Sequence, residues 1–445
     1  MIEYRNLRVA ILGAGSVGAQ VASLLLEHGD ELASRVGAGL ELVGVAVRDP
    51  KAKRTTDIPK HLITTDARSL ILGADIVIEL MGGLEPAREY LELAMNSGAD
   101  VITANKALLA THGPELFAIA EQVGAQLYYE AAVGGAIPII RPLRDSLAGD
   151  RVHRILGIVN GTTNYILDRM DVEGDSLAEA LAAATALGYA EADPTADIGG
   201  YDAAQKASIL ASLAFHTTVP LDSVYREGIE KITHAQVLAA RAAGYVVKLL
   251  AVCERLVDAE TGVEGVSARV HPALVPLTHP LAAVHGANNA VFLEAEAAGS
   301  LMFYGAGAGG KQTASAVLGD LVSAARRHVI GGPGVAESTQ SNLPILPMSS
   351  VTTRYQITLE VVDQPGVLAA IATMFSEHGV SVEAVQQNVQ LGGAPAGGTE
   401  GTAPTATLVI GTHEATESAL AATVARLEAN DAVAEVTSVL RVEGL

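Results

Sequence analysis

The sequence has little cysteine, few aromatic residues and few cations, and each shortage narrows the functions open to it. Its 445 residues include one cysteine, no tryptophan and 4% aromatic residues. Cys253 alone cannot form an internal disulfide or a cage of thiolate metal ligands, which fits a reducing compartment. The 29 Lys and Arg residues face 50 Asp and Glu residues, a formal net charge of −21. Such a surface repels phosphate backbones and acidic membranes, so we expect neither nucleic acid nor membrane as a partner.

Long apolar runs and a leader segment are also lacking. Runs such as Val43–Val47 and Ile76–Leu80 are much shorter than the roughly 20 residues that cross a bilayer. The first eight residues show no basic stretch followed by a long apolar segment and a cleavage site. We therefore expect a globular, cytoplasmic protein, which at roughly 100 to 200 residues per domain has about two to four domains.

The signatures of two common enzyme classes are missing. The 12 histidines form no His-Glu-x-x-His pair, and there is no Gly-x-Ser-x-Gly elbow, so zinc hydrolysis and serine-nucleophile chemistry have no support. Cys253 lies in the apolar run Gly244–Leu256, which we expect to be helical, and a small buried hydrophobe is favoured over a nucleophile there. Phosphorylating aldehyde dehydrogenases, which need a thiol nucleophile, fit poorly.

The first 140 residues alternate short apolar runs with helical stretches, which is typical of parallel βαβ units. Five strands are expected, at Leu7–Leu12, Leu40–Val47, Ile76–Leu80, Asp100–Thr103 and Gln126–Glu130. They predict a Rossmann-type, doubly wound α/β domain over residues 1–140. From 141 to 304, alanine-rich helices mix with strands such as Arg151–Val159 and Gly265–Pro272, which predicts a separate central α+β domain.

The remainder divides into a linker and a small C-terminal domain. Gly, Pro and Ser residues between 331 and 350 predict the linker. From 351 to 445 the pattern gives a strand at Arg354–Val362, a helix at Gly366–His378, a strand at Val380–Gln390, a loop at Gly392–Pro404, and then a strand, a helix and a strand. This βαββαβ order predicts a ferredoxin-like domain.

A glycine-rich turn, G-A-G-S-V-G at residues 13–18, lies between the first strand and a helical run. Gly13 permits the tight turn, Gly15 lets the backbone approach a pyrophosphate, and Gly18 lets helix and strand pack closely. The phosphate would lie at the helix N-terminus, beside Ser16 and Val17. The context favours a dinucleotide site over a plain glycine turn.

The second strand ends at Val47-Arg48-Asp49, close to where the adenosine ribose lies in such folds. An acidic residue there favours NAD(H), whereas a cation favours the 2′-phosphate of NADP(H). Arg48 offers a planar fork for phosphate, and three more cations follow at positions 51, 53 and 54. The sequence therefore favours NADP(H). NAD(H) stays open, because Asp49 could face the ribose and the cations could belong to a solvated loop.

Lys106 ends the sequence T-A-N-K, directly after the fourth strand. Ligands of doubly wound sheets lie at the carboxyl ends of the strands, so Lys106 is expected near the nicotinamide. An exposed loop lysine is the alternative.

The densest group of carboxylates precedes Lys206. Its members are Glu191, Asp193, Asp197 and Asp202. Asp202 and Lys206 are four residues apart at the start of a predicted helix, so they share a face and the carboxylate can hold the ammonium. A solvated salt bridge is the alternative. The loop before the helix is rich in Gly and Pro, which favours recognition of a substrate ammonium by its carboxylates.

Two further turns follow strands. The sequence E-A-A-V-G-G-A-I-P at 130–138 offers free backbone carbonyls, which suit a hard cation, although on its own it indicates only a crossover between domains. The sequence N-G-T-T-N at 160–164 opens a helix, and its hydroxyl and amide groups suit either capping or carboxylate binding.

Together these motifs resemble the homoserine dehydrogenases that carry a C-terminal ACT domain. The resemblance covers nearly the whole chain and includes G-A-G-A-G-G at 305–310, while residues 188–206 are its most specific part. It implies reversible, NAD(P)H-dependent reduction of L-aspartate 4-semialdehyde to L-homoserine, on the route from aspartate to threonine and methionine. It also implies that the segment at about 305–330, with a helix at Thr313–Ile330, returns to complete the nucleotide domain.

The resemblance further implies roles for single residues. Lys206 would be the general acid/base that protonates the oxygen as hydride reaches the aldehyde carbon, Lys106 would polarise or orient that oxygen, and Asp202 would position Lys206 or the substrate. The substrate would also meet Glu191, Asp197, Gly161 and Thr162. The cofactor would meet Gly188 and Gly305 besides the residues of the glycine turn, Arg48 and Lys106. A monovalent cation, Na⁺, would bind backbone oxygens of Glu130, Val133, Gly135 and Ile137.

The tail resembles an ACT regulatory domain. The usual effector site of that family maps to the turn with Asp363, Gly366, Val367 and Leu368. Residues 351–445 hold three basic and eleven acidic residues, so an effector carboxylate would need backbone donors. The resemblance implies feedback inhibition by L-threonine and a homodimer or homotetramer. A tail that serves only in assembly is the alternative.

Two other functions stay open. One is an amino-acid sensor whose nucleotide fold no longer catalyses, and the other is a different NAD(P)-dependent semialdehyde dehydrogenase. The presence of Lys106, Asp202 and Lys206 together with an uninterrupted glycine turn argues against the sensor.

Overall fold

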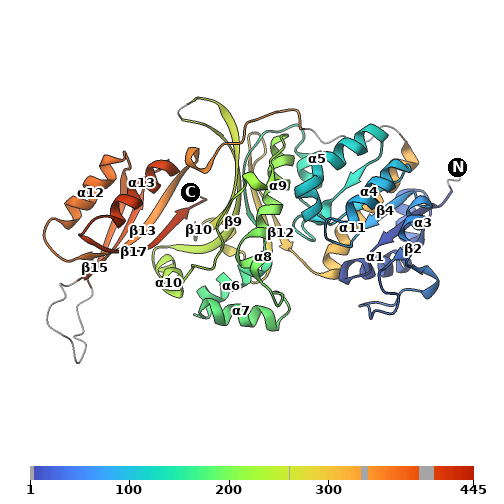
Figure 1. Cartoon of the computed structure of the whole chain (residues 1–445), viewed down its shortest axis with the longest axis horizontal. Helices are drawn as coiled ribbons and strands as arrows, with labels where there is room; N and C mark the ends of the chain where they lie inside the picture. The colour runs from blue at the N-terminus through green and yellow to red at the C-terminus, as the bar shows by residue number, and fades with distance from the viewer. Residues whose placement is uncertain (1–4, 260, 332–338, 390–404, 445) are drawn as a thin grey trace.

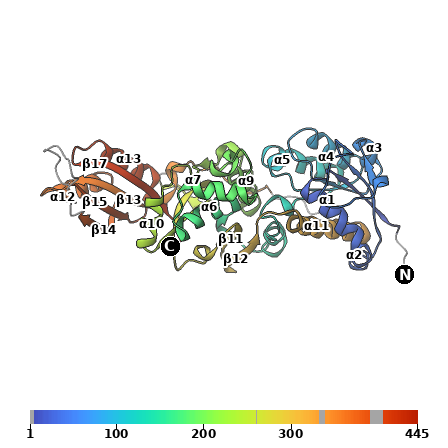
Figure 2. The same ribbon diagram turned by 90° about the horizontal axis from the view of Figure 1, so that it is seen from below.

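The computed structural model describes residues 5–259, 261–331, 339–389 and 405–444. Three parts lie in a row, with the N-terminal part at one end and the C-terminal part at the other (Figures 1 and 2). No helix within those ranges is both long and apolar enough to cross a membrane.

The N-terminal part is a six-stranded parallel sheet in the order β3-β2-β1-β4-β5-β6. Its strands are β1 (Leu7–Leu12), β2 (Leu40–Ala46), β3 (Ile63–Thr64), β4 (Ile76–Glu79), β5 (Asp100–Thr103) and β6 (Leu127–Tyr128). Its helices are α1 (Ser16–Glu27), α2 (Gly29–Val36), α3 (Ala67–Leu72), α4 (Ala87–Asn96) and α5 (Lys106–Val123). The doubly wound sheet is confirmed. Only β3 escaped prediction, because two residues carry no detectable periodicity.

Helix α11 (Gly310–Ile330) follows the central part in the sequence and returns to this sheet. Its Val317 and Leu321 are buried in the same core as Val9 and Ile11. At its C-terminal end, the Arg327 guanidinium lies 2.8 Å from a carboxylate oxygen of Asp100, the first residue of β5. The expected return of this helix to the nucleotide fold is thus seen in its packing.

The central part combines long strands with helices. The strands are β7 (Val152–Ile158), β8 (Tyr225–Arg226), β9 (Tyr245–Val257), β10 (Glu264–Pro276), β11 (Asn288–Ala295) and β12 (Gly299–Ala306). The helices are α6 (Gly161–Val172), α7 (Leu177–Ala186), α8 (Thr195–Ile198), α9 (Tyr201–Phe215) and α10 (His234–Ala242). Helix α9 packs on β9 and β10 and is buried along most of its length.

The helix expected over Gly244–Leu256 is wrong, because this segment is strand β9. The strand lies between β7 and β10, and residues 246–253 are all buried. A strand covered on both faces has a continuous apolar run that periodicity cannot distinguish from a buried helix. Cys253 is nevertheless buried, as expected. Burial raises the pKa of its thiol to about 12, so a thiolate nucleophile is disfavoured.

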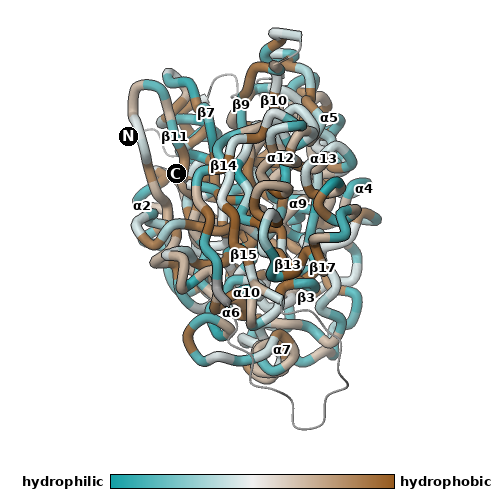
Figure 3. Tube along the Cα trace, turned by 90° about the vertical axis from the view of Figure 1, so that its left-hand side faces the viewer, coloured by the Kyte–Doolittle hydropathy of each residue, from teal (hydrophilic) through white to brown (hydrophobic). Residues whose placement is uncertain are grey.

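The C-terminal part has the predicted βαββαβ order. Its elements are β13 (Thr352–Val362), α12 (Val367–Glu377), β14 (Val382–Val389), β15 (Thr405–Thr412), the short β16 (Ala415–Thr416), α13 (Glu417–Glu428) and β17 (Val433–Val442). Ile357, Leu359, Phe375 and Leu408 belong to its own core, and apolar segments lie among β13, β15 and β17 in Figure 3. The loop expected at Gly392–Pro404 lies outside the described residues.

The central and C-terminal sheets are continuous. Strand β17 pairs in parallel with β10, with Ala273 opposite Arg441 and Leu274 opposite Val442. In the resulting eleven-stranded sheet, nine strands follow the order β12-β11-β7-β9-β10-β17-β13-β15-β14, and the short strands β8 and β16 pair off this path with β10 and β13. The C-terminal part is therefore joined to the central part by backbone hydrogen bonds as well as by the chain.

Candidate active site

The N-terminal ends of α5 and α9 meet where the first two parts of the molecule touch. Lys106 is the first residue of α5, and Asn105 caps this helix by accepting a hydrogen bond from the Leu108 N–H at 3.1 Å. Asp202 and Lys206 lie in the first two turns of α9. Lys106 is therefore held at a helix terminus rather than in a loop.

Asp202 binds two lysines, one on each carboxylate oxygen. Lys206 Nζ lies 2.7 Å from Oδ2, and Lys106 Nζ lies 2.9 Å from Oδ1. The Lys206 ammonium also donates to the Val159 carbonyl at 2.6 Å. Asp202 and Lys206 are each only 9% exposed, whereas the Lys106 side chain is 39% exposed. The i,i+4 pair is thus a buried structure and not a solvated surface bridge.

The charge of Asp202 is stabilised by its neighbours. Burial opposes ionisation, but Lys206, Lys106 and the hydrogen bond from Asn160 outweigh it and hold the pKa of Asp202 well below its usual range. Asp202 is therefore an anion throughout the neutral range. It fixes two ammonium groups without competing with them for a proton.

Asn160 organises the two carboxylates of the site, a role that the sequence did not reveal. Its Nδ2 donates to Asp197 at 2.7 Å and to Asp202 at 3.0 Å. Its Oδ1 accepts from the Thr163 N–H at 2.8 Å, so it is also the N-cap of α6. The sequence N-G-T-T-N predicted either capping or carboxylate binding, but it did not indicate which carboxylates, and these lie more than thirty residues away.

Asp197 and the N-terminus of α6 form the second half of the site. Burial, reinforced by the charge of Asp202, raises the pKa of Asp197 above its usual value, although the hydrogen bond from Asn160 partly opposes this. The Thr162 hydroxyl donates to the Tyr189 carbonyl at 2.8 Å, which holds the 188–191 loop against α6.

The structure gives a steric reason for glycine at position 161 but shows no contact for the Glu191 side chain. A Cβ on Gly161 would stand 2.5 Å from the Ala287 carbonyl oxygen, so a side chain does not fit there. Glu191 is exposed, and its side chain has no partner within the described parts of the chain. The structure therefore does not bring Glu191 to the two lysines.

The glycine turn has the features of a dinucleotide site. Gly13 has a φ of 99°, and a Cβ on it would stand 2.6 Å from the Leu80 carbonyl. A Cβ on Gly18 would stand 2.1 Å from the Gly13 carbonyl, whereas one on Gly15 would meet nothing within 4 Å. Helix α1 begins at Ser16, followed by Val17, and no side chain caps it. Open space beside uncapped N–H groups fits a pyrophosphate.

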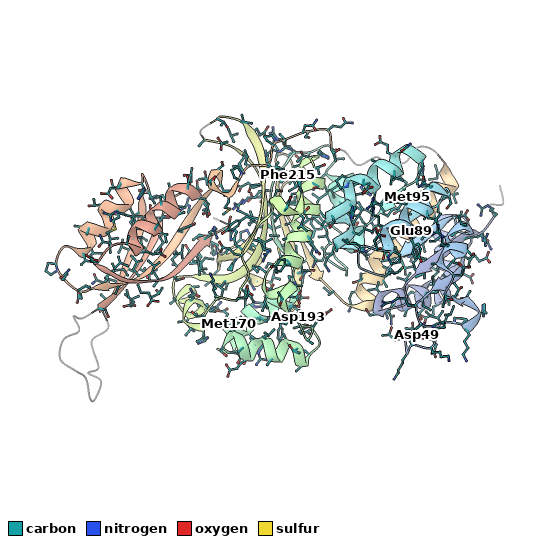
Figure 4. All side chains as sticks on the ribbon, viewed as in Figure 1. Asp49, Glu89, Met95, Met170, Asp193 and Phe215 are labelled. Atoms are coloured by element: carbon teal, nitrogen blue, oxygen red, sulfur yellow. The ribbon has the colours of Figure 1, made fainter. Side chains whose placement is uncertain are left out.

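The loop after β2 contains cations that differ in their side-chain contacts. Arg54 donates to backbone carbonyls of its own loop, including that of Asp49 at 2.9 Å. One oxygen of the Asp49 carboxylate accepts the Lys51 N–H at 2.8 Å. Arg48 is exposed and has no side-chain partner among the residues described. Asp49 and Asp193 both lie at the lower edge of the molecule in Figure 4.

A buried carboxylate at the end of β4, Glu79, was missed by sequence reasoning. It is fully buried and accepts from the N–H groups of Met81 and Gly82 at 2.7 and 3.2 Å, and from the Thr103 hydroxyl at 2.6 Å. It thus ties the loop after β4 to the end of β5, directly before Lys106. Its position at a strand end was the only available signal.

The turn after β6 packs against the second glycine stretch. The Glu130 carboxylate accepts from the N–H groups of residues 139–141 and from Arg141 Nε at 2.8 Å, so its backbone oxygen is the atom left for a cation. A Cβ on Gly135 would stand 2.4 Å from the Gly307 carbonyl oxygen. The described residues contain no His, Cys, Asp and Glu cluster suited to a metal, which leaves the backbone oxygens of Glu130, Val133, Gly135 and Ile137 as candidates.

The remaining predicted positions lie as follows. Gly305 is in β12, and a Cβ added to it would stand 3.4 Å from Ile137 Cγ1. A Cβ added to Gly310 would stand 2.8 Å from the carbonyl oxygen of Ser16. Gly188 is exposed after α7, with a φ of 76°. In the C-terminal part, Gly366 has a φ of 95° and is the N-cap residue of α12, which has no side-chain cap. Val367 is buried, and Leu368 and Asp363 are exposed.

Comparisons with known proteins agree with this arrangement. Residues 13–130 match the family model of the homoserine dehydrogenase NAD-binding domain, residues 138–322 that of homoserine dehydrogenase, and residues 355–431 that of the ACT domain. The chain is 54% identical over 448 residues to the homoserine dehydrogenase of Mycobacterium tuberculosis, covering 99% of each.

Solved structures show the same similarity. A homoserine dehydrogenase from Thiobacillus denitrificans has a TM-score of 0.89 and 37% identity, with 99% of each chain covered. A hyperthermophilic archaeal homoserine dehydrogenase in complex with NADPH has a TM-score of 0.60 and 26% identity, covering 74% of this chain and 99% of that one. The predicted fold class and family are confirmed. The chain belongs to the homoserine dehydrogenase family and is an oxidoreductase with a NAD-binding domain, a catalytic domain and a C-terminal ACT domain.

Proposed function

We propose that this homoserine dehydrogenase interconverts L-aspartate 4-semialdehyde and L-homoserine at the cluster of Lys106, Asp202 and Lys206. The observation that carries the proposal is the single buried carboxylate held between two ammonium groups. When bound, the nicotinamide supplies hydride to the aldehyde carbon. Lys206 then provides a proton from Nζ to the oxygen, and it takes that proton back in the oxidation of homoserine.

The other residues of the cluster position the reacting oxygen. Lys106, at the N-terminus of α5, orients this oxygen and stabilises its developing negative charge. Asp202 keeps both ammonium groups pointed at one place. Its lowered pKa supports this role, because an anion that stays ionised does not withdraw the proton from Lys206.

We assign the amino-acid end of the substrate to the α6–α8 region. Asp197 and the exposed Glu191 are proposed to bind the ammonium, and Gly161 and Thr162 to lie beside the carboxylate at the N-terminus of α6. Helix N-termini favour anions, which supports the second assignment. Asp197 is the better supported of the two carboxylates, because Asn160 links it directly to Asp202.

We propose NADP(H) as the preferred cofactor, with NAD(H) as the weaker one. Arg48, which has no side-chain partner among the residues described, supports a 2′-phosphate contact. The NADPH complex of the archaeal relative supports a phosphorylated cofactor. The glycine turn from Gly13 to Gly18, Lys106, Gly188 and Gly305 complete the proposed cofactor site.

We also propose a monovalent cation, Na⁺, on the backbone oxygens of Glu130, Val133, Gly135 and Ile137. The engagement of the Glu130 carboxylate by four N–H donors supports a backbone site. The expected measurement is a rise in activity with Na⁺ at constant ionic strength. A rate independent of the cation would remove this part of the proposal.

For the whole chain, we propose a cytoplasmic homodimer or homotetramer inhibited by L-threonine at the turn of Asp363, Gly366, Val367 and Leu368. The uncapped N-terminus of α12 offers backbone donors for an amino-acid carboxylate. We propose domain limits of 1–140 with 305–330 for the nucleotide domain, 141–304 for the catalytic domain, 331–350 for the linker and 351–445 for the ACT domain.

One set of initial rates tests these assignments. Homoserine-dependent reduction of NADP⁺ and of NAD⁺ is measured with and without threonine. We expect activity with both cofactors, faster at limiting NADP⁺ and reduced by threonine. Equal use of the two cofactors would reject the Arg48 assignment, and insensitivity to threonine would reject the effector.

A further inference from the structure

The ACT domain touches the catalytic domain through an arginine of its last strand. Arg441 lies in β17, opposite Ala273 of β10, and is only 9% exposed. Within the ACT domain it is paired with Glu417 at the start of α13, through both Nε and Nη2. The Tyr355 hydroxyl donates to the same carboxylate at 2.6 Å. The arginine is therefore fixed from its own side by a buried carboxylate.

The other side of this guanidinium reaches the catalytic domain. Arg441 Nη1 lies 3.1 Å from a Glu227 oxygen, and Nη2 lies 3.4 Å from the Tyr225 hydroxyl. The same Glu227 oxygen accepts a hydrogen bond from Tyr225. Arg441 lowers the pKa of Glu227 against the opposing effect of burial, so the pair is ionised at neutral pH. One guanidinium thus links carboxylates of two domains.

The segment around Glu227 packs directly on the joint between α8 and α9. Arg226, next to it in β8, donates to the Gly199 carbonyl and stacks over the Tyr201 ring at 3.5 Å. A Cβ on Gly228 would stand 2.2 Å from the Ile198 carbonyl oxygen, so the two backbones are in close contact. The Ile229 N–H donates to the same carbonyl at 2.8 Å.

This joint carries the two carboxylates of the site on its two sides. Asp197 is in α8, and Asp202 is in α9, with Gly199 and Gly200 between the helices. Gly200 has a φ of 77°, which a residue with a side chain adopts only at a cost, so the joint has a defined shape. The Glu227 segment therefore packs on the joint that separates Asp197 from Asp202.

We propose that Arg441 and Glu227 are positioning residues, through which the ACT domain sets the geometry of the substrate carboxylates Asp197 and Asp202. The inference rests on the proposed substrate role of those two carboxylates. It makes homoserine affinity depend on an ACT-domain side chain, even without an effector. The glycine turn, Arg48 and Lys106 of the proposed cofactor site are on the nucleotide domain, so we expect NADP⁺ affinity not to depend on this contact.

The test is a double-mutant cycle on the full-length enzyme. Glu227→Gln, Arg441→Gln and the double variant are compared in their KM for homoserine, KM for NADP⁺ and kcat. We expect each single variant to raise the homoserine KM by about twofold to thirtyfold, the range of side chains that couple distant sites. The KM for NADP⁺ should stay within about twofold, and the double variant should be no worse than the poorer single one, because the partners act as a pair.

Two controls keep the result interpretable. Arg426→Gln breaks an ion pair with Glu377 that lies wholly inside the ACT domain, and it should leave the homoserine KM unchanged. Glu227→Gln keeps the size of a side chain that is 43% exposed, and an unchanged thermal unfolding midpoint shows that the variant is folded. Additive effects in the cycle, or equal changes in both KM values, would overturn the proposal.

Asp197→Asn, measured in the same assay, distinguishes the substrate role of Asp197 from the positioning role of Glu227 and Arg441. If it raises the homoserine KM while Glu227→Gln and Arg441→Gln do not, the substrate site stands and the positioning role fails. If Asp197→Asn has no effect on that KM, the proposed function of the carboxylate fails, and the inference built on it fails as well.

Discussion

Lys106 and Lys206 bind opposite oxygens of one carboxylate, at 2.9 and 2.7 Å from Asp202, although they belong to different domains. Lys106 begins the helix that follows β5 of the nucleotide domain, and Lys206 lies on α9 of the catalytic domain. The contact therefore brings the two lysines together only when the two domains are in register. In the proposed mechanism, substrate and cofactor meet at the same groups that link the two domains.

Replacing Asp202 by Asn removes the shared counter-charge while keeping the size of the side chain. Both lysines then lose the anion that orients them, so kcat/KM for homoserine should fall by about 100-fold or more, as for the loss of a positioned proton-transfer group. Steady-state rates measure this fall. Asp193→Asn is the matched control, because its amide oxygen can still accept from the Thr195 N–H at the 3.1 Å contact. A loss of similar size in the control would contradict the assignment.

The acidic limb of the pH profile should report Asp197. Because burial raises its pKa, Asp197 takes up a proton at a higher pH than an ordinary aspartate, and its protonated form binds an ammonium poorly. We expect kcat/KM for homoserine to fall with decreasing pH, beginning above the usual aspartate range. Asp197→Asn should have a low value throughout and lack this limb. The same limb in both enzymes would assign it to another group.

Arg48→Ala should change cofactor selectivity. A charged hydrogen bond to a 2′-phosphate contributes about 1.5–3 kcal/mol, so the KM for NADP⁺ should rise by about tenfold or more while that for NAD⁺ stays nearly constant. Lys53→Ala removes a charge from the same exposed loop and controls for general electrostatic attraction. Equal effects of the two variants on NADP⁺ would show that no specific contact exists at Arg48.

Glu443, at the end of β17, should make stability depend on pH. Burial opposes its ionisation, but Arg269, His271 and Arg154 outweigh burial and hold its pKa below the usual range. Its charge therefore stabilises the fold above the ordinary glutamate pKa of about 4.3, and this contribution is lost as pH falls below that value. Glu443→Gln should cost about 3 kcal/mol near neutral pH, since Arg269 keeps Glu254 as a partner at 3.0 Å.

Denaturant unfolding of both proteins at several pH values measures this effect. The difference in unfolding free energy should be largest near neutral pH and shrink in acid. A difference that is constant with pH would mean that the Glu443 charge is not the stabilising element.

The sequence predicted motifs formed by neighbouring residues, but it did not predict contacts between residues far apart in the chain. The Asp202–Lys206 pair can be predicted from helical spacing alone. The glycine turn can be recognised as a dinucleotide motif because a strand precedes it and a helix follows it. The contact of Lys106 with Asp202 joins residues 96 positions apart and depends on the packing of two domains. Strand β9 was mistaken for a helix because both of its faces are buried.

The contacts of three polar residues could be recognised only from the structure. Asn160 had a capping signal, but its bonds to two carboxylates depend on how α6, α8 and α9 pack. Glu79 and Arg441 are charged residues near the carboxyl ends of strands, and their buried partners come from other elements. No local pattern distinguishes such charges from residues on a solvated face.

The central claim is that Lys206 transfers the proton, and its most direct test is the turnover of Lys206→Met with saturating homoserine and NADP⁺. The measurement is the initial rate of nicotinamide reduction, with the dissociation constant of NADPH determined on the same preparation. The account predicts that the rate falls by at least about 100-fold while NADPH binds as tightly as in the wild type, because the nucleotide domain is untouched. A near-normal rate in protein that binds NADPH normally would remove Lys206 from the reaction and contradict the account.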